Sequence, residues 1–214
     1  MDKKYTEIYM NYSEQDFETL LNIESMPYIE TFTNHHSNRY EPTIYQDLVT
    51  LIEVTQSDYD DTSLLIDFGS GLMRVPIFLN FILNIQAMGI ELNKQLYLKS
   101  KTNIKDYQLK HQSNHVSALN INALQYHFTG QETHLFFFNP FSIFIFQKVM
   151  ENLMDSAIEH CYIILYYAKP EYEIYLSDLI NFKLKYSIPL KNFKEDPSEK
   201  INIYQYTQIS KGTP

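Results

Sequence analysis

The 214-residue chain has a formal net charge of -9 and contains eighteen Tyr, fourteen Phe, five Gly and one Cys. This length supports one sizeable α/β core with an N-terminal extension, and the acidic charge disfavours nucleic acid as a partner without excluding a local basic patch. The single Cys161 excludes an internal disulfide, and the chain contains neither an apolar signal core nor 18 uninterrupted apolar residues, so we expect a cytoplasmic protein without a membrane span.

The first elements expected along the chain are two helices. Ser13 and Asp16 have the S-x-x-D spacing of a helix start, and apolar residues at near-helical spacing extend the helix over Glu14–Ile23. The polar stretch Glu24–Thr43 lacks a period and predicts an irregular connector. A second helix is expected over Tyr45–Val54, because its leucines and isoleucine fall on one face.

Strands and helices then alternate, which is typical of parallel βα units. The expected strands are Ser63–Phe68, Gln86–Glu91, Val116–Asn120, Leu135–Asn139 and Tyr162–Tyr167. The expected helices are Arg74–Leu83, Lys94–Tyr107, Ile143–Ser156 and Tyr172–Asn181.

Two further apolar runs, Lys183–Ile188 and Ile201–Tyr206, predict an antiparallel pair at the end of the chain. The fold class expected is therefore α/β, with a doubly wound, seven-stranded, mostly parallel sheet, an antiparallel C-terminal strand and an N-terminal helical extension. We divide the chain into an extension or lid over residues 1–60, a ligand-binding domain over 61–209 and a flexible tail over 210–214.

The most informative motif is the turn after the first strand. Asp67, Gly69 and Gly71 form D-x-G-x-G between a strand and a helix, and the glycines allow a sharp turn and a close backbone approach to a ligand. Glu91 follows about 20 residues later, at the end of the second strand, where a carboxylate accepts ribose hydroxyls. The motif alone is equally consistent with an ordinary turn, but this context favours an adenosine-like ligand.

Two common nucleotide motifs do not fit this turn. A dinucleotide fingerprint requires a third small residue where Arg74 stands, and no G-K-[ST] sequence is present. The remaining pattern resembles class I S-adenosylmethionine-dependent methyltransferases, together with Asn120–Ala123 after the third strand and Asn139–Phe141 after the fourth. The stretch Arg39–Tyr45 is similar to that in a group of bacterial members with undefined acceptors.

The resemblance implies a Rossmann-like methyltransferase fold, S-adenosylmethionine as cofactor and a role for each matching residue. It assigns the cofactor to Asp67, Gly69, Ser70, Gly71, Glu91, Asn122 and Ala123. It assigns the catalytic floor of the acceptor pocket to Asn139, Pro140 and Phe141. We expect Tyr40, Glu41 and Tyr45 to form a lid over the acceptor.

Two residues depart from the family pattern. Met73 stands where many members have a third glycine and is accommodated if its flexible side chain turns outward, and Asn122 stands where many have Asp. These departures keep open a cofactor-binding protein without turnover. The preferred hypothesis is a methyltransferase acting on a small molecule or protein side chain, and a nitrogen of RNA or DNA is the alternative acceptor.

The remaining reactive residues indicate structural roles. The histidines, including His134, show no metal-ligand spacing, so no metal is expected. Cys161 precedes an apolar run and is interpreted as a core residue. Tyr166 and Tyr167 are expected at an aromatic rim on the acceptor side, and the basic cluster that includes Lys185 is interpreted as a solvated face.

Overall fold

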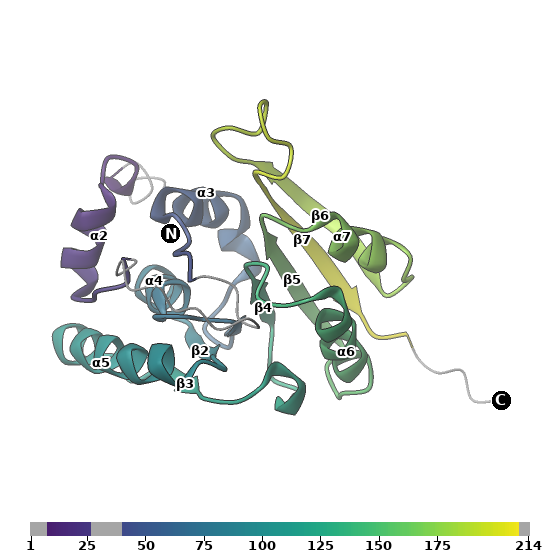
Figure 1. The fold of residues 1–214 in the computed structure, drawn as a ribbon, viewed down its shortest axis with the longest axis horizontal. Coiled ribbons are helices and arrows are strands. Elements are labelled where there is room, and N and C mark those ends of the chain that lie inside the picture. Colours follow the sequence, from purple (N-terminus) through teal and green to yellow (C-terminus); the bar gives the residue numbers. More distant parts are fainter. Residues whose placement is uncertain (1–7, 27–39, 210–214) are drawn as a thin grey trace.

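A seven-stranded sheet in the order β3-β2-β1-β4-β5-β7-β6 forms the centre of the protein (Figure 1). The computed structural model describes residues 8–26 and 40–209. The strands are β1 Leu64–Phe68, β2 Gln86–Ile90, β3 Val116–Leu119, β4 His134–Phe137, β5 His160–Tyr166, β6 Phe182–Pro189 and β7 Lys200–Thr207. The expected fold class is confirmed.

Helices cover both faces of this sheet. They are α2 Glu14–Leu21, α3 Tyr45–Thr55, α4 Arg74–Leu83, α5 Lys94–His111, α6 Ile143–Met154 and α7 Pro170–Ser177, with short 3₁₀ turns η1 Gln56–Asp58 and η2 Ala123–Gln125. The first four helices pack in one apolar cluster and α6 and α7 in the other, on opposite sides of the sheet (Figure 1). Successive strand residues such as Leu65 and Ile66 enter opposite clusters, as the two-residue period of a strand requires.

The first five strands run parallel, as expected, and β7 is antiparallel to both of its neighbours. After β5 the chain forms β6 at the edge of the sheet and then returns as β7, which lies between β5 and β6. The register aligns Phe68 with Ile90 and Phe137, so the loops after β1, β2 and β4 begin side by side. The predicted site residues therefore follow strands that end together.

Most element boundaries agree with the expectations within two or three residues, and the differences have local causes. Helix α2 ends at Leu21 because Asn22 adopts the left-handed conformation. Strand β4 ends at Phe137, two residues before the expected end, because the chain turns at Asn139, where φ is +43°. The flexible tail 210–214 and part of the expected connector, residues 27–39, lie outside the described residues, and the division into 1–60 and 61–209 stays a prediction.

Candidate functional site at the carboxyl edge of the sheet

The turn after β1 lies directly on the end of β2. The backbone N–H groups of Gly69 and Ser70 both donate to the carbonyl of Ile90, at 2.8 and 3.1 Å. Gly69 and Gly71 have φ values of +85° and +52°, a region that residues with a Cβ rarely adopt. The backbone path therefore favours glycine at these two positions.

Two predicted site residues contact these glycines. A Cβ built on Gly69 would lie 2.5 Å from Cβ of Pro140, and one built on Gly71 would lie 2.2 Å from the ring of Tyr40. The two glycines thus accommodate side chains of the protein from both sides of the turn. This packing brings Tyr40, Pro140 and the glycine turn together, although they lie far apart in the sequence.

Glu91 is joined to the turn by its carboxylate. It is 8% exposed, its Oε2 accepts from the N–H of Gly71 at 2.9 Å and its Oε1 accepts from the N–H of Asn93 at 2.7 Å. The backbone N–H of Leu92 also interacts with this carboxylate, whose two oxygens offer about four acceptor positions, so part of its accepting capacity remains for a further donor. Burial raises the pKa of Glu91, against the lowering effect of the backbone N–H groups.

Asp67 is the second titratable group of the turn. Asp67 is 4% exposed at the end of β1, and its carboxylate forms no hydrogen bond within residues 8–26 and 40–209. Its oxygens are not among the fully enclosed polar atoms without a partner, so they keep a small accessible surface. Burial raises its pKa well above the ordinary value, and the nearby charge of Glu91 raises it further. A buried carboxylate without donors is costly, and such groups occur preferentially at functional sites.

Ser70 and Met73 turn inward rather than toward the open edge. The Ser70 hydroxyl is buried without a partner, and Met73 is fully buried with φ +70°. Both pack over Gly89, where an added Cβ would lie 2.4 Å from Oγ of Ser70 and 2.1 Å from Sδ of Met73. Met73 is thus accommodated inside the fold and not by an outward-turned side chain, because Gly89 on β2 leaves space for it. Gly89 was missed by the sequence analysis, although a glycine inside a strand signals a close approach.

The loops after β2 and β3 are joined by Asn120. Its side-chain amide donates to the carbonyls of Glu91 and Leu92, at 2.7 and 3.1 Å. Asn122 caps η2 by accepting from the N–H of Leu124 at 3.0 Å, and Ala123 is the first residue of that turn. Asn122 and Ala123 are therefore brought to the same edge as Glu91.

These joined loops also carry exposed apolar side chains that the sequence analysis did not single out. Leu92 is 65% exposed immediately after Glu91, and Leu119 and Leu124 are 38% and 37% exposed. The signal available in the sequence was an apolar residue directly after the proposed ribose-binding acid. Each of them presents an exposed apolar side chain close to the carboxyl ends of β2 and β3.

The segment after β4 is held to the end of β5. The side-chain amide of Asn139 donates to the carbonyl of Tyr167, and both residues have positive φ values. The carbonyl of Phe141 accepts from the hydroxyl of Tyr172 at 2.6 Å. The half-buried ring of Phe141 lies edge-on to that of Phe137. Asn139, Pro140 and Phe141 thus form one wall of the edge, next to Gly69.

The three expected lid residues have different positions. Tyr40 lies on Gly71, and its hydroxyl donates to the carbonyl of Ser25 at 2.8 Å. Glu41 is exposed. Tyr45 is fully buried, and its hydroxyl donates a hydrogen bond to Glu18 at 2.8 Å, so the structure does not bring it to the site.

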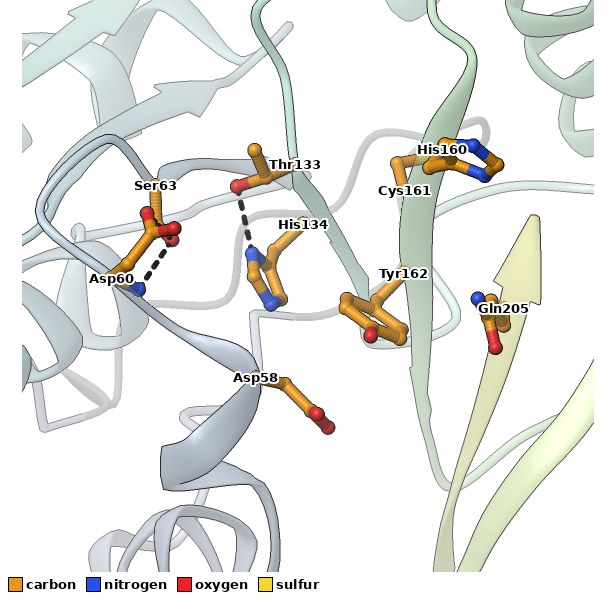
Figure 2. Close-up of a pocket in the computed structure, with 9 residues that line it drawn as sticks. All are labelled: Asp58, Asp60, Ser63, Thr133, His134, His160, Cys161, Tyr162 and Gln205. Atoms are coloured by element: carbon orange, nitrogen blue, oxygen red, sulfur yellow. Dashed lines mark hydrogen bonds between the residues drawn. The ribbon is translucent and has the colours of Figure 1, made fainter. Parts of the chain in front are cut away.

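A separate pocket of about 150 Å³ lies at the amino edge of the sheet. Its lining residues are Asp58, Asp60, Ser63, Thr133, His134, His160, Cys161, Tyr162 and Gln205. Figure 2 shows the His134 ring in this pocket with its hydrogen bond to Thr133, at 2.8 Å. Burial lowers the pKa of His134 to about 3, so the ring is neutral near pH 7.

The other residues interpreted as structural are mostly buried. Cys161 is 3% exposed, in agreement with a core role. Tyr166, expected at an aromatic rim, is instead buried, and its hydroxyl donates to Asp47 at 2.7 Å. Lys185, expected on a solvated face, instead donates to Asp58 at 2.6 Å. In the described part of the chain no group of three or more His, Cys, Asp or Glu is arranged as a metal site, and no helix is long and apolar enough to cross a bilayer.

The fold is that of class I S-adenosylmethionine-dependent methyltransferases. The chain is similar to an RNA methyltransferase of Salinibacter ruber in complex with S-adenosylhomocysteine, with 17% identity, a TM-score of 0.55, and 81% of this chain and 97% of the other covered. It is also similar to a human methyltransferase 10 domain containing protein, with 9% identity, a TM-score of 0.64, and 97% and 100% covered.

A third similar structure is the N-terminal domain of human METTL16 in complex with S-adenosylhomocysteine. It is 10% identical, with a TM-score of 0.61, and 98% of this chain and 85% of the other are covered. The sequence matches no protein-family model and no curated protein. At these identities the comparisons establish a shared fold, and they leave the acceptor open.

Proposed function

We propose that this chain is a methyltransferase that binds S-adenosylmethionine at the carboxyl edge of its sheet. The observation that carries the proposal is the convergence of Asp67 and Glu91, two buried carboxylates, on one glycine turn at the ends of β1 and β2. Ligands of open α/β sheets bind at this edge. The cytoplasmic location stays a prediction.

The polar groups present suit this cofactor. Asp67 forms no hydrogen bond within the described residues and offers its carboxylate to a ligand that carries positive charge. Glu91 is proposed to accept from the ribose hydroxyls with the acceptor positions that its backbone N–H donors leave open. Asn122 and Ala123, with the apolar surface of Leu92, are proposed to border the adenine. Ser70 is proposed to shape the turn rather than to donate to the cofactor, because its hydroxyl points toward β2 and its N–H already donates to Ile90.

When bound, the sulfonium cofactor supplies the methyl group, so the protein mainly contributes proximity and alignment. Asn139, Pro140 and Phe141 are proposed to form the floor on which the acceptor is aligned. The Asn139 side chain that joins β4 to β5 would keep this floor rigid, and the half-buried Phe141 ring offers an apolar contact.

The preferred acceptor is a small molecule or a protein side chain. The net charge of -9 opposes broad contact with a phosphate backbone, which proteins normally neutralise with Lys and Arg. A nitrogen of RNA or DNA is the second candidate. Two of the similar structures are named as an RNA methyltransferase and an rRNA methylase, and Asn139-Pro140-Phe141 carries an aromatic ring that a base could contact.

Two measurements test these proposals. Calorimetry with S-adenosylmethionine and S-adenosylhomocysteine is expected to show binding, and its absence in the folded protein would remove the proposed cofactor. Labelled cofactor is then incubated with cell extract, and the products are split by nuclease and by protease. Label found only in nuclease-sensitive material overturns the preferred acceptor, and binding without any transfer supports a non-catalytic cofactor-binding protein.

A further inference from the structure

Arg74 stands at the first position of α4, directly after the glycine turn, and its side chain is 3% exposed. A guanidinium has five N–H donors. All five are used: Nε donates to Oγ of Ser25 at 2.7 Å, Nη1 to Glu14 and to the carbonyl of Thr43, and Nη2 to Glu18 and to Sδ of Met26. Arg74 therefore has no donor left for a ligand.

The contacts of Arg74 lead to Tyr40 from two directions. Glu18 is 4% exposed and accepts from both the N–H and the hydroxyl of Ser25 as well as from Arg74. The carbonyl of the same Ser25 accepts from the Tyr40 hydroxyl at 2.8 Å. On the other side, Arg74 donates at 2.9 Å to the carbonyl of Thr43, which is three residues past Tyr40.

The charges in this network depend on one another. Arg74 is paired with Glu14 and Glu18, and its guanidinium lies 4.2 Å from the centre of the Tyr45 ring. Without Arg74, the carboxylate of Glu18 would remain buried and uncompensated, which is strongly unfavourable. Lys at this position would keep the charge but would supply three donors and no plane to stack on Tyr45.

We propose that Arg74 is the positioning residue that holds the Tyr40 ring on Gly71 and thereby shapes the wall of the cofactor site beside the glycine turn. This inference rests on the proposed function, because it assigns the wall to that site. Arg74 stands where a dinucleotide fingerprint has its third small residue, and holding Tyr40 in place is the role of an arginine at this position. Arg74 acts through Ser25 and Tyr40 and does not touch the ligand.

The first test reads the position of Tyr40 without any cofactor. Tetranitromethane nitrates the phenolate of Tyr, and burial raises the pKa of the Tyr40 hydroxyl, so Tyr40 should react slowly in the wild type. Lys at position 74 keeps a positive charge, which lowers the pKa of Tyr40, but releases the ring from its buried position, so Arg74→Lys is expected to speed the nitration of Tyr40, mapped by mass spectrometry. Lys185→Met breaks a partly buried ion pair with Asp58 at the opposite edge and should leave Tyr40 protected.

The second test measures the affinity for S-adenosylhomocysteine in a double-mutant cycle. Tyr40→Phe removes only the hydroxyl link to Ser25, and Arg74→Lys removes the geometry that holds it. If Arg74 acts through Tyr40, each change and their combination should all weaken binding about fivefold, rather than multiplying to about 25-fold. Urea unfolding confirms that each variant is folded, and Lys185→Met should lower stability without changing affinity.

The outcomes separate the two proposals. Unchanged nitration of Tyr40 in Arg74→Lys, or independent effects in the cycle, would overturn the positioning role even when the wild type binds the cofactor. If the wild type binds no cofactor, the proposed function fails and the assignment of this wall to a cofactor site fails with it, whatever the nitration result. Faster nitration with coupled losses of affinity supports the proposal.

Discussion

Replacing Asp67 by Asn should make the protein more stable and the cofactor bind more weakly. Asp67 is buried at 4% exposure, its carboxylate has no donor among the described residues, and Glu91 adds a repulsive charge. Leaving such a group unsatisfied costs about 1 to 3 kcal/mol, and more when it is charged. Asn has nearly the same shape and no charge, so we expect a gain in unfolding free energy of about 1 to 3 kcal/mol at pH 8.

The sign of the pH dependence follows from the raised pKa of Asp67. The folded state binds the proton more tightly than the unfolded state, so the wild type recovers stability as the pH falls through the folded pKa. The advantage of Asp67→Asn should therefore be complete above that pKa and disappear below the unfolded value of 3.8. Urea unfolding of both proteins at several pH values measures this difference.

The affinity should change in the opposite direction. Hydrogen bonds to charged groups contribute about 1.5 to 3 kcal/mol, so loss of the Asp67 charge should weaken S-adenosylmethionine binding about 10- to 100-fold in calorimetry. Asp61→Asn is the matched control, because Asp61 is exposed, and it should change neither quantity. A less stable Asp67→Asn variant, or one that binds with wild-type affinity, would refute this reasoning.

Three other changes test separate parts of the structure. Glu91→Gln should weaken cofactor binding at least about tenfold and also lower stability, because backbone N–H groups face both carboxylate oxygens and an amide has only one oxygen to accept from them. Wild-type affinity in calorimetry would contradict the ribose assignment. Gly89→Ala should lower the free energy of unfolding in urea by about 1 to 3 kcal/mol, because its Cβ would meet Met73. The double variant with Met73→Ala should lose less stability than the sum of the two single variants, and strict additivity would argue against this contact. The lowered pKa of His134 means that the unfolded state binds the proton first as the pH falls. The His134 contribution to stability should therefore decrease by about 1.4 kcal/mol for each pH unit of acidification between roughly pH 6 and pH 4, and His134→Phe should remove that component from the pH profile; identical profiles in both proteins would count against a buried neutral ring.

The amino-acid sequence by itself determined the secondary elements and the approximate place of the site. The alternation of apolar strands with amphipathic helices is a local property, because it depends on periods of two and about 3.6 residues along the chain. Asp67 and Glu91 end neighbouring parallel strands, and the ends of such strands meet at one edge. Their convergence was therefore predictable without coordinates.

Only the tertiary structure decided which side chains cover the turn. Tyr40 reaches Gly71 through a network that joins Arg74 to α2, and Met73 turns inward because Gly89 on a different element leaves room for it. Such contacts depend on the space and donors that distant segments supply, and no local pattern encodes them. For the same reason Tyr45, which the sequence suggested for the lid, lies in the core beneath Arg74.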